Sequence, residues 1–201
     1  KLGSSAMKNI DFWFSIGSTY TYLTVMRMKE IERKEGVTFT WRPFSVRALM
    51  LEMNNRPFIG KPVKAQYMWR DIERRAARYG IPVKVPAPYP LEHFDLVNRI
   101  AVLAARDGWC EDYVRTSYVY WFQKGIPAGE GENLKAALEH AGQPVERILE
   151  RADSKEIEDA YHAATAEARE LGIFGSPSFI AGGKELFWGD DRLEDAIAWQ
   201  R

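Results

Sequence analysis

The sequence predicts an α/β fold in which a β-α-β unit comes first, a long helical stretch follows, and a β-β-α unit ends the chain. Two observations lead to this prediction. Short runs with strand-like character occur towards each end of the sequence, over residues 9–15, 37–41, 178–181 and 185–188. Residues 92–171 instead carry, almost throughout, the apolar spacing of amphipathic helices. A helical insertion of about 125 residues is therefore expected inside an α/β domain.

The β-α-β unit begins with an aromatic-rich strand near Asn9–Ser15. A helix is expected from Ser18 to about Lys34, because its apolar residues fall on one side and its charged residues on the other. Gly36 ends this helix, and the alternating segment Val37–Trp41 forms the second strand. Since one helix connects the two strands, we expect them to be parallel.

The insertion is expected to open with helices near Val46–Met53 and Lys64–Tyr79, which a loop rich in Asn, Gly and Pro separates. Breaks at residues 125–131, 142–144 and 153–154 divide the helical stretch that follows. Two strand-like segments around a Gly-Gly turn then predict a hairpin, and a last helix is expected over Asp190–Gln200. We therefore divide the chain into an α/β domain, residues 7–45 and 172–201, and a helical insertion domain, residues 46–171.

Composition narrows the range of functions. The chain has 28 acidic and 28 basic residues, so no overall charge draws in nucleic acid or a membrane surface. No apolar stretch approaches the roughly 20 residues of a membrane span. Residues 1–6 are interpreted as an expression-tag remnant, and no secretory segment follows Met7. Cys110 is the only cysteine, which excludes an intrachain disulfide and a thiolate metal cluster, so a reducing, cytoplasmic setting is expected.

Ser18 is the first candidate functional residue. It follows a strand and a glycine and is expected at the first turn of a helix, where unpaired N–H groups favour anions. Such a position would stabilise a thiolate that a ligand brings in. A serine that only caps the helix would occupy the same place, so this segment alone leaves both roles open. The three histidines show no metal-ligand spacing, and no metal site is expected.

The order of elements resembles the thioredoxin fold with a helical insertion, as in the bacterial disulfide oxidase DsbA. Those oxidases carry Cys-x-x-Cys where this chain has Ser18-Thr19-Tyr20-Thr21, which rules out dithiol–disulfide exchange at this site. Within the fold, the chain is similar to the family of kappa-class glutathione transferases and 2-hydroxychromene-2-carboxylate isomerases. The match lies in residues 12–23, 55–68, 175–179 and 186–193, and the last segment, with its Trp-Gly-x-Asp-Arg-Leu element, resembles the isomerase branch.

The resemblance implies that glutathione is the bound cosubstrate. Ser18 would donate a hydrogen bond to the glutathione sulfur and lower the pKa of its thiol. A cis-Pro177 would leave the main-chain N–H and C=O of Ser176 unpaired, so that they bind the cysteinyl unit and the Ser176 side chain need not matter. At the start of the last helix, Asp190 and Asp191 would belong to the glutathione site: N–H groups would bind the γ-glutamyl carboxylate and Asp191 its ammonium. Because a second acid beside the carboxylate would repel it, Asp190 could instead act only as an N-cap.

Two further residues match the family in the loop before the long second helix of the insertion. Asn55 and Lys64 correspond to residues that reach glutathione or the second substrate. Taken alone, Lys64 suits a solvated lysine, and two aspartates at a helix start suit ordinary capping. Trp69 and Tyr89 are expected either in the core or beside a flat substrate.

The resemblance implies a glutathione-dependent isomerase that acts on a small aromatic-derived electrophile, such as 2-hydroxychromene-2-carboxylate, by reversible thiolate addition. Two alternatives stay open. The same site could run conjugation or peroxide reduction, as kappa-class transferases do, or the chain could be a non-catalytic thioredoxin-fold binding module. Relatives are commonly dimeric, so a homodimer is one option.

Overall fold

The computed structural model describes residues 7–201, so the proposed expression-tag remnant lies outside the described residues. Its centre is a four-stranded sheet with the order β2-β1-β3-β4. The parallel pairing of β1 with β2 and the antiparallel hairpin of β3 and β4 are both confirmed. The strands are β1 (Lys8–Phe14), β2 (Val37–Pro43), β3 (Ser178–Ala181) and β4 (Glu185–Trp188).

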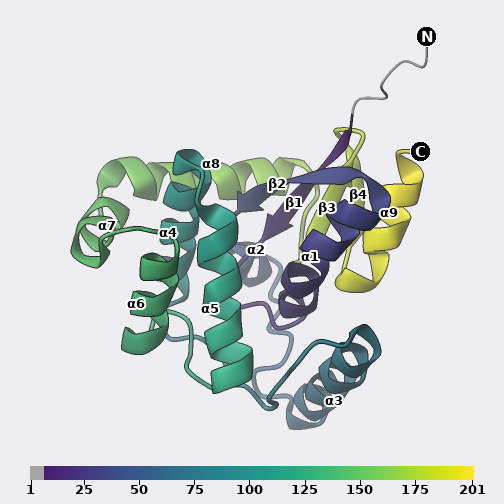
Figure 1. The fold of residues 1–201 in the computed structure, drawn as a ribbon, viewed down its shortest axis with the longest axis horizontal. Helices are drawn as coiled ribbons and strands as arrows, with labels where there is room; N and C mark the ends of the chain where they lie inside the picture. Colours follow the sequence, from purple (N-terminus) through teal and green to yellow (C-terminus); the bar gives the residue numbers. More distant parts are fainter. Residues whose placement is uncertain (1–6) are drawn as a thin grey trace.

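Helices α2 to α8 all lie between β2 and β3 in the chain, as the sequence predicts for the insertion. In Figure 1, α4 to α8 form the left part of the molecule, the sheet with α1 and α9 forms the right part, and α3 lies below. The helices are α1 (Thr21–Glu35), α2 (Val46–Glu52), α3 (Pro62–Tyr79), α4 (Phe94–Asp107), α5 (Cys110–Lys124), α6 (Gly131–His140), α7 (Val145–Ala152), α8 (Lys155–Glu170) and α9 (Leu193–Trp199). None of those in the described range is long and apolar enough to cross a bilayer.

Successive side chains of β1 point to opposite faces of the sheet and so pack into two different parts of the core. Phe12 and Phe14 are fully buried in the larger cluster, which also contains apolar residues of α1, α4, α5 and α9. Trp13 points to the other face of the sheet, as the two-residue period of a strand requires, and packs with Phe44 and with Ala168 of α8. Because β1 is buried on both faces, its position is fixed by the sheet, α1 and the insertion together.

The helix predicted from Ser18 begins three residues later, at Thr21, so the interpretation of Ser18 as an N-cap is wrong. Two bonds hold Ser18 in a turn instead. Its N–H donates to the Ser15 carbonyl at 3.3 Å, and its carbonyl accepts from the Tyr118 hydroxyl at 2.8 Å. Tyr20 occupies the N-cap position, and its side chain makes no capping hydrogen bond.

The last helix also differs from the expectation. A short 3-10 turn, η1 (Asp190–Arg192), precedes α9, and Gly189 rather than Asp190 is its N-cap residue. The backbone of Gly189 has a φ of 109°, a conformation that residues with a side chain rarely adopt. The expectation that Asp190 caps the last helix is therefore wrong.

Candidate active site

Ser18 and the Ser176–Pro177 segment meet between β1 and the start of α1. The Ser176–Pro177 peptide bond is cis, as the resemblance implies. The Ser18 hydroxyl donates to the Ser176 carbonyl at 2.7 Å, so the expectation that this carbonyl is unpaired is wrong. The Ser176 N–H, in contrast, finds no acceptor within residues 7–201. Ser18 is half-buried.

The side chain of Ser176 contributes directly to this arrangement, in addition to its main chain. Its hydroxyl accepts from the Ser15 N–H at 3.0 Å and is 2.9 Å from the Thr21 hydroxyl. The Ser15 hydroxyl, for its part, bonds to the main chain of Phe44 and Val46. Side-chain hydroxyls therefore tie three main-chain segments together around Ser18.

Residues of the insertion hold the turn that carries Ser18. The Asn98 amide of α4 bonds to both the N–H and the carbonyl of Ile16, each at 2.8 Å. The Tyr118 hydroxyl of α5 donates to the carbonyls of Ser15 and Ser18, at 3.2 and 2.8 Å. Burial raises the pKa of Tyr118 above its usual range, so this hydroxyl keeps its proton.

Unpaired main-chain donors follow Ser18. The first bonds of the helical segment run from the Tyr22 N–H to the Thr19 carbonyl and from the Leu23 N–H to the Tyr20 carbonyl. The N–H groups of Tyr20 and Thr21 have no acceptor within the described residues. Such free amides at a helix start favour a negatively charged ligand atom.

The η1 turn lies next to the cis-proline. The Gly189 N–H donates to the Pro177 carbonyl at 2.9 Å, and the exposed Asp191 follows two residues later. A Cβ atom added at Gly189 would come within 2.5 Å of Asp191 Oδ1, so the absence of a side chain leaves room for this carboxylate. The structure thus brings Asp191 to the same region as Pro177 and Ser18.

Asp190 faces into the protein. Its carboxylate is buried and paired with Arg27 of α1 at 2.9 Å and with Arg75 of α3 at 2.9 Å. The Thr24 hydroxyl also donates to it, at 2.8 Å. These partners occupy both carboxylate oxygens, so Asp190 is not available to cap a helix or to touch a ligand directly.

Asn55 and Lys64 are the two remaining candidates from the sequence. Both are exposed, and no hydrogen bond within residues 7–201 joins either side chain to Ser18, Ser176 or Asp191. Lys64 Nζ lies 5.7 Å from the centre of the Phe58 ring. One turn further along α3, Met68 is the contact that connects this helix to the site, because its sulfur is 2.9 Å from the Thr19 hydroxyl.

Aromatic side chains of the insertion gather between α3 and α5. The Tyr89 ring centre is 6.3 Å from Phe58 and 6.1 Å from Trp69, and Trp69 is 6.1 Å from Phe122. Trp69 and Tyr89 are partly buried and pack against the core. The core contacts agree with the first expectation for these two residues, and a place beside a flat substrate stays a prediction.

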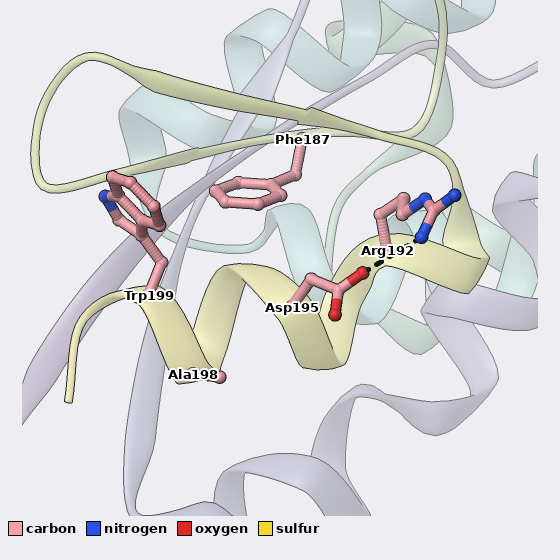
Figure 2. Close-up of a pocket in the computed structure, with 5 residues that line it drawn as sticks. All are labelled: Phe187, Arg192, Asp195, Ala198 and Trp199. Carbon is pink, nitrogen blue, oxygen red and sulfur yellow. Dashed lines mark hydrogen bonds and ion pairs between the residues drawn. The ribbon is translucent and has the colours of Figure 1, made fainter.

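Two other features lie elsewhere in the molecule. Glu92, His93 and Glu130 bring one ligand atom each to within 4.8 Å of one another, a grouping that the sequence does not predict. Figure 2 shows an open hollow between β4 and α9, where Arg192 and Asp195 form an ion pair beside two aromatic rings. Its lining includes none of the predicted site residues (Phe187, Arg192, Asp195, Ala198, Trp199).

The residues that hold the site together are not among the candidates that the sequence offers. Thr21, Arg27, Arg75, Asn98 and Tyr118 all bond to the Ser18 turn, to Ser176 or to Asp190. The position of Asn98 on the apolar face of its helix is a signal that could have pointed to it, since a buried amide needs hydrogen-bond partners.

The sheet order, the cis-proline and the helical insertion together define a thioredoxin fold of the DsbA type. The family model for the DSBA-like thioredoxin domain matches residues 9–197, and the chain belongs to this family.

The relatives divide into two named groups. The chain is 27% identical over 189 residues to a 2-hydroxychromene-2-carboxylate isomerase of Sphingobium xenophagum, covering 93% of this chain and 95% of the relative. It is 24% identical over 208 residues to glutathione S-transferase kappa 1 of Caenorhabditis elegans, covering 93% and 88%. A solved 2-hydroxychromene-2-carboxylate isomerase superposes with a TM-score of 0.82 at 24% identity, covering 95% of both chains. The resemblance to both branches, isomerase and kappa-class transferase, is thus confirmed.

Proposed function

We propose that the protein is a glutathione-dependent isomerase similar to 2-hydroxychromene-2-carboxylate isomerase. The observation that carries the proposal is the hydrogen bond from the half-buried Ser18 hydroxyl to the Ser176 carbonyl, 2.7 Å long, beside the cis-Pro177. The names of the full-length relatives support both the enzyme class and glutathione as cosubstrate.

The Ser18 hydroxyl can serve two partners in turn. A hydroxyl proton rotates about the Cβ–Oγ bond, so Ser18 can leave the Ser176 carbonyl and donate to a sulfur. That rotation releases the Ser176 carbonyl, which then accepts a hydrogen bond while the free Ser176 N–H donates one. A cysteinyl unit presents this combination of thiol, N–H and C=O, so glutathione fits the donors and acceptors of these residues.

In the proposed reaction, the residues of this chain stabilise the charge on the glutathione sulfur and position glutathione and the substrate. Bound glutathione supplies a thiol for reversible addition to an electrophilic carbon of the substrate. The Ser18 hydroxyl and the N–H groups of Tyr20 and Thr21 stabilise negative charge on the sulfur, which lowers the pKa of the thiol. Asp191 holds the γ-glutamyl ammonium, and Lys64 and Asn55 approach the glycyl carboxylate or an acidic substrate. Holding both molecules raises their effective concentration.

The test is the variant Ser18→Ala. We expect it to fold and to bind glutathione but to lose most turnover of 2-hydroxychromene-2-carboxylate, because the thiolate loses a hydrogen bond worth about 1.5–3 kcal/mol, or roughly 10- to 150-fold. Ser117→Ala is the matched control, since it removes a buried serine hydroxyl that bonds only within α5. Full activity of Ser18→Ala would remove Ser18 from the mechanism.

Two alternatives give different results. Consumption of glutathione would indicate conjugation or peroxide reduction, whereas an isomerase returns it unchanged. A binding module without a glutathione site would show no thermal shift at millimolar glutathione. A specific site adds about 2.7 kcal/mol at 100 times its dissociation constant.

We also retain three expectations as proposals: a cytoplasmic setting, a homodimer, and the division into residues 7–45 with 172–201 and residues 46–171. The long segment from α2 to α8 between β2 and β3 supports the division. Analytical ultracentrifugation tests the dimer directly.

A further inference from the structure

A buried carboxylate joins three separate segments of the chain. The Asp190 side chain is 1% exposed. Its Oδ1 accepts from Thr24 at 2.8 Å and from Arg27 at 2.9 Å, both on α1. Its Oδ2 accepts from Arg75 on α3 at 2.9 Å. Asp190 itself is the first residue of η1, so α1, α3 and η1 meet at this one group.

Arg27 and Arg75, the two arginines that pair with Asp190, each have further partners. Arg27 also pairs with Glu194 at the start of α9, and its guanidinium lies over the Tyr79 ring, 4.1 Å from the ring centre. Arg75 also donates to the Tyr79 hydroxyl at 3.0 Å. Burial acts to lower the pKa of Arg75, but the hydrogen bond and charge of Asp190 outweigh it, and the pKa is raised. Arg75 therefore remains charged.

The ion cluster of Asp190, Arg27 and Arg75 is not expected to add much to the free energy of unfolding. A buried ion pair is typically no more stabilising than apolar residues of similar size in the same place. The cluster instead fixes the position of η1 relative to α1 and α3. Gly189, directly before Asp190, donates to the Pro177 carbonyl, and Asp191, directly after it, is exposed. Arg75 is on the helix that carries Lys64 and contacts Thr19 through Met68.

We propose that Arg75 is a positioning residue that, through Asp190, holds η1 so that Asp191 faces the γ-glutamyl end of glutathione. Arg75 thereby connects α3, which carries Lys64, to the η1 turn, which carries Asp191. The ligand named here rests on the proposed function, whereas the effect on η1 does not. Since Asp190 keeps Thr24 and Arg27 when Arg75 is replaced, the fold is expected to survive the change.

The experiment compares Arg75→Gln with Arg70→Gln. Arg70 is a matched control because it lies on α3, is exposed, and within residues 7–201 pairs only with Glu73 on the same helix. In Arg75→Gln we expect amide hydrogen exchange of residues 189–195 to become faster, with the other core segments unchanged. We expect reduced glutathione to bind about tenfold more weakly by calorimetry, while kcat at saturation changes by less than about twofold. Arg75→Lys should restore part of the affinity, because it returns one charged donor.

The outcomes separate the two proposals. Unchanged exchange over 189–195 in Arg75→Gln, or faster exchange throughout the protein, would overturn the positioning role. Unchanged glutathione affinity together with faster local exchange would overturn the link from η1 to the ligand. If the unaltered protein binds no glutathione while exchange in Arg75→Gln rises only at η1, the proposed function fails and the hold of Arg75 on η1 stands.

Discussion

Asn98→Ala tests the idea that the insertion holds the Ser18 turn. Asn98 is fully buried on α4, and its amide satisfies both the N–H and the carbonyl of Ile16, each at 2.8 Å. Its third bond goes to the Phe94 carbonyl. Replacing Asn98 by alanine removes all three bonds and leaves the two main-chain groups of Ile16 buried without partners.

The cost follows from those two groups. A buried main-chain group without a partner costs about 1–3 kcal/mol, so the two together cost about 2–6 kcal/mol. A loss of about 4 kcal/mol is a large fraction of the roughly 5–15 kcal/mol that a domain has, and the variant should still fold. For a chain of this length, each kcal/mol lowers Tm by about 2–4 °C, so a decrease of about 8–16 °C is expected.

Thermal unfolding followed by circular dichroism measures this decrease. Asn133→Ala is the control, because Asn133 is also fully buried but bonds to the main-chain carbonyls of Ser117 and Ile126 and not to the Ser18 turn. Both variants should lose stability, but only Asn98→Ala should also lose turnover, since only it loosens the Ser18 turn. A Tm within about 2 °C of the parent protein for Asn98→Ala would refute the reasoning.

Two further predictions concern single side chains. Burial raises the pKa of the Cys110 thiol well above its usual range, so a thiol reagent at pH 8 should label the unfolded protein and leave the native protein unmodified. A Cβ at Gly175 would clash with the indole nitrogen of Trp188, whose ring is tilted against that of Phe174 with the ring centres 5.1 Å apart. Gly175→Ala should therefore move this indole and shift the tryptophan fluorescence, and the same change in a Trp188→Phe background should leave the spectrum unaltered.

Local patterns and the resemblance were enough to predict the elements and the central part of the site. The strands, the hairpin and the helical insertion follow from apolar spacing and from Gly and Pro positions. Ser18 and Pro177 are 159 residues apart in the sequence, and only the resemblance to the family predicts that they lie close together. The 2.7 Å hydrogen bond from Ser18 to Ser176 agrees with that prediction.

Long-range polar partners could not be predicted. Asp190 has the sequence appearance of an ordinary N-cap, but Arg75, 115 residues earlier, and Arg27 bury it in an ion cluster. Ser18 does not cap the helix that follows it, and its hydroxyl donates to the carbonyl of Ser176, 158 residues further on. In both cases a partner from another part of the chain competes successfully with the local capping preference.

The central claim is that the Ser18 hydroxyl keeps the sulfur of bound glutathione negatively charged. The most direct measurement is the pKa of that thiol in the complex, followed by the ultraviolet absorbance of the thiolate, in the parent protein and in Ser18→Ala. A cysteine thiol titrates near about pH 8.5 when free. We predict a pKa at least about one unit lower in the parent complex than in the Ser18→Ala complex, since one unit equals about 1.4 kcal/mol. Equal values in the two complexes would contradict the account.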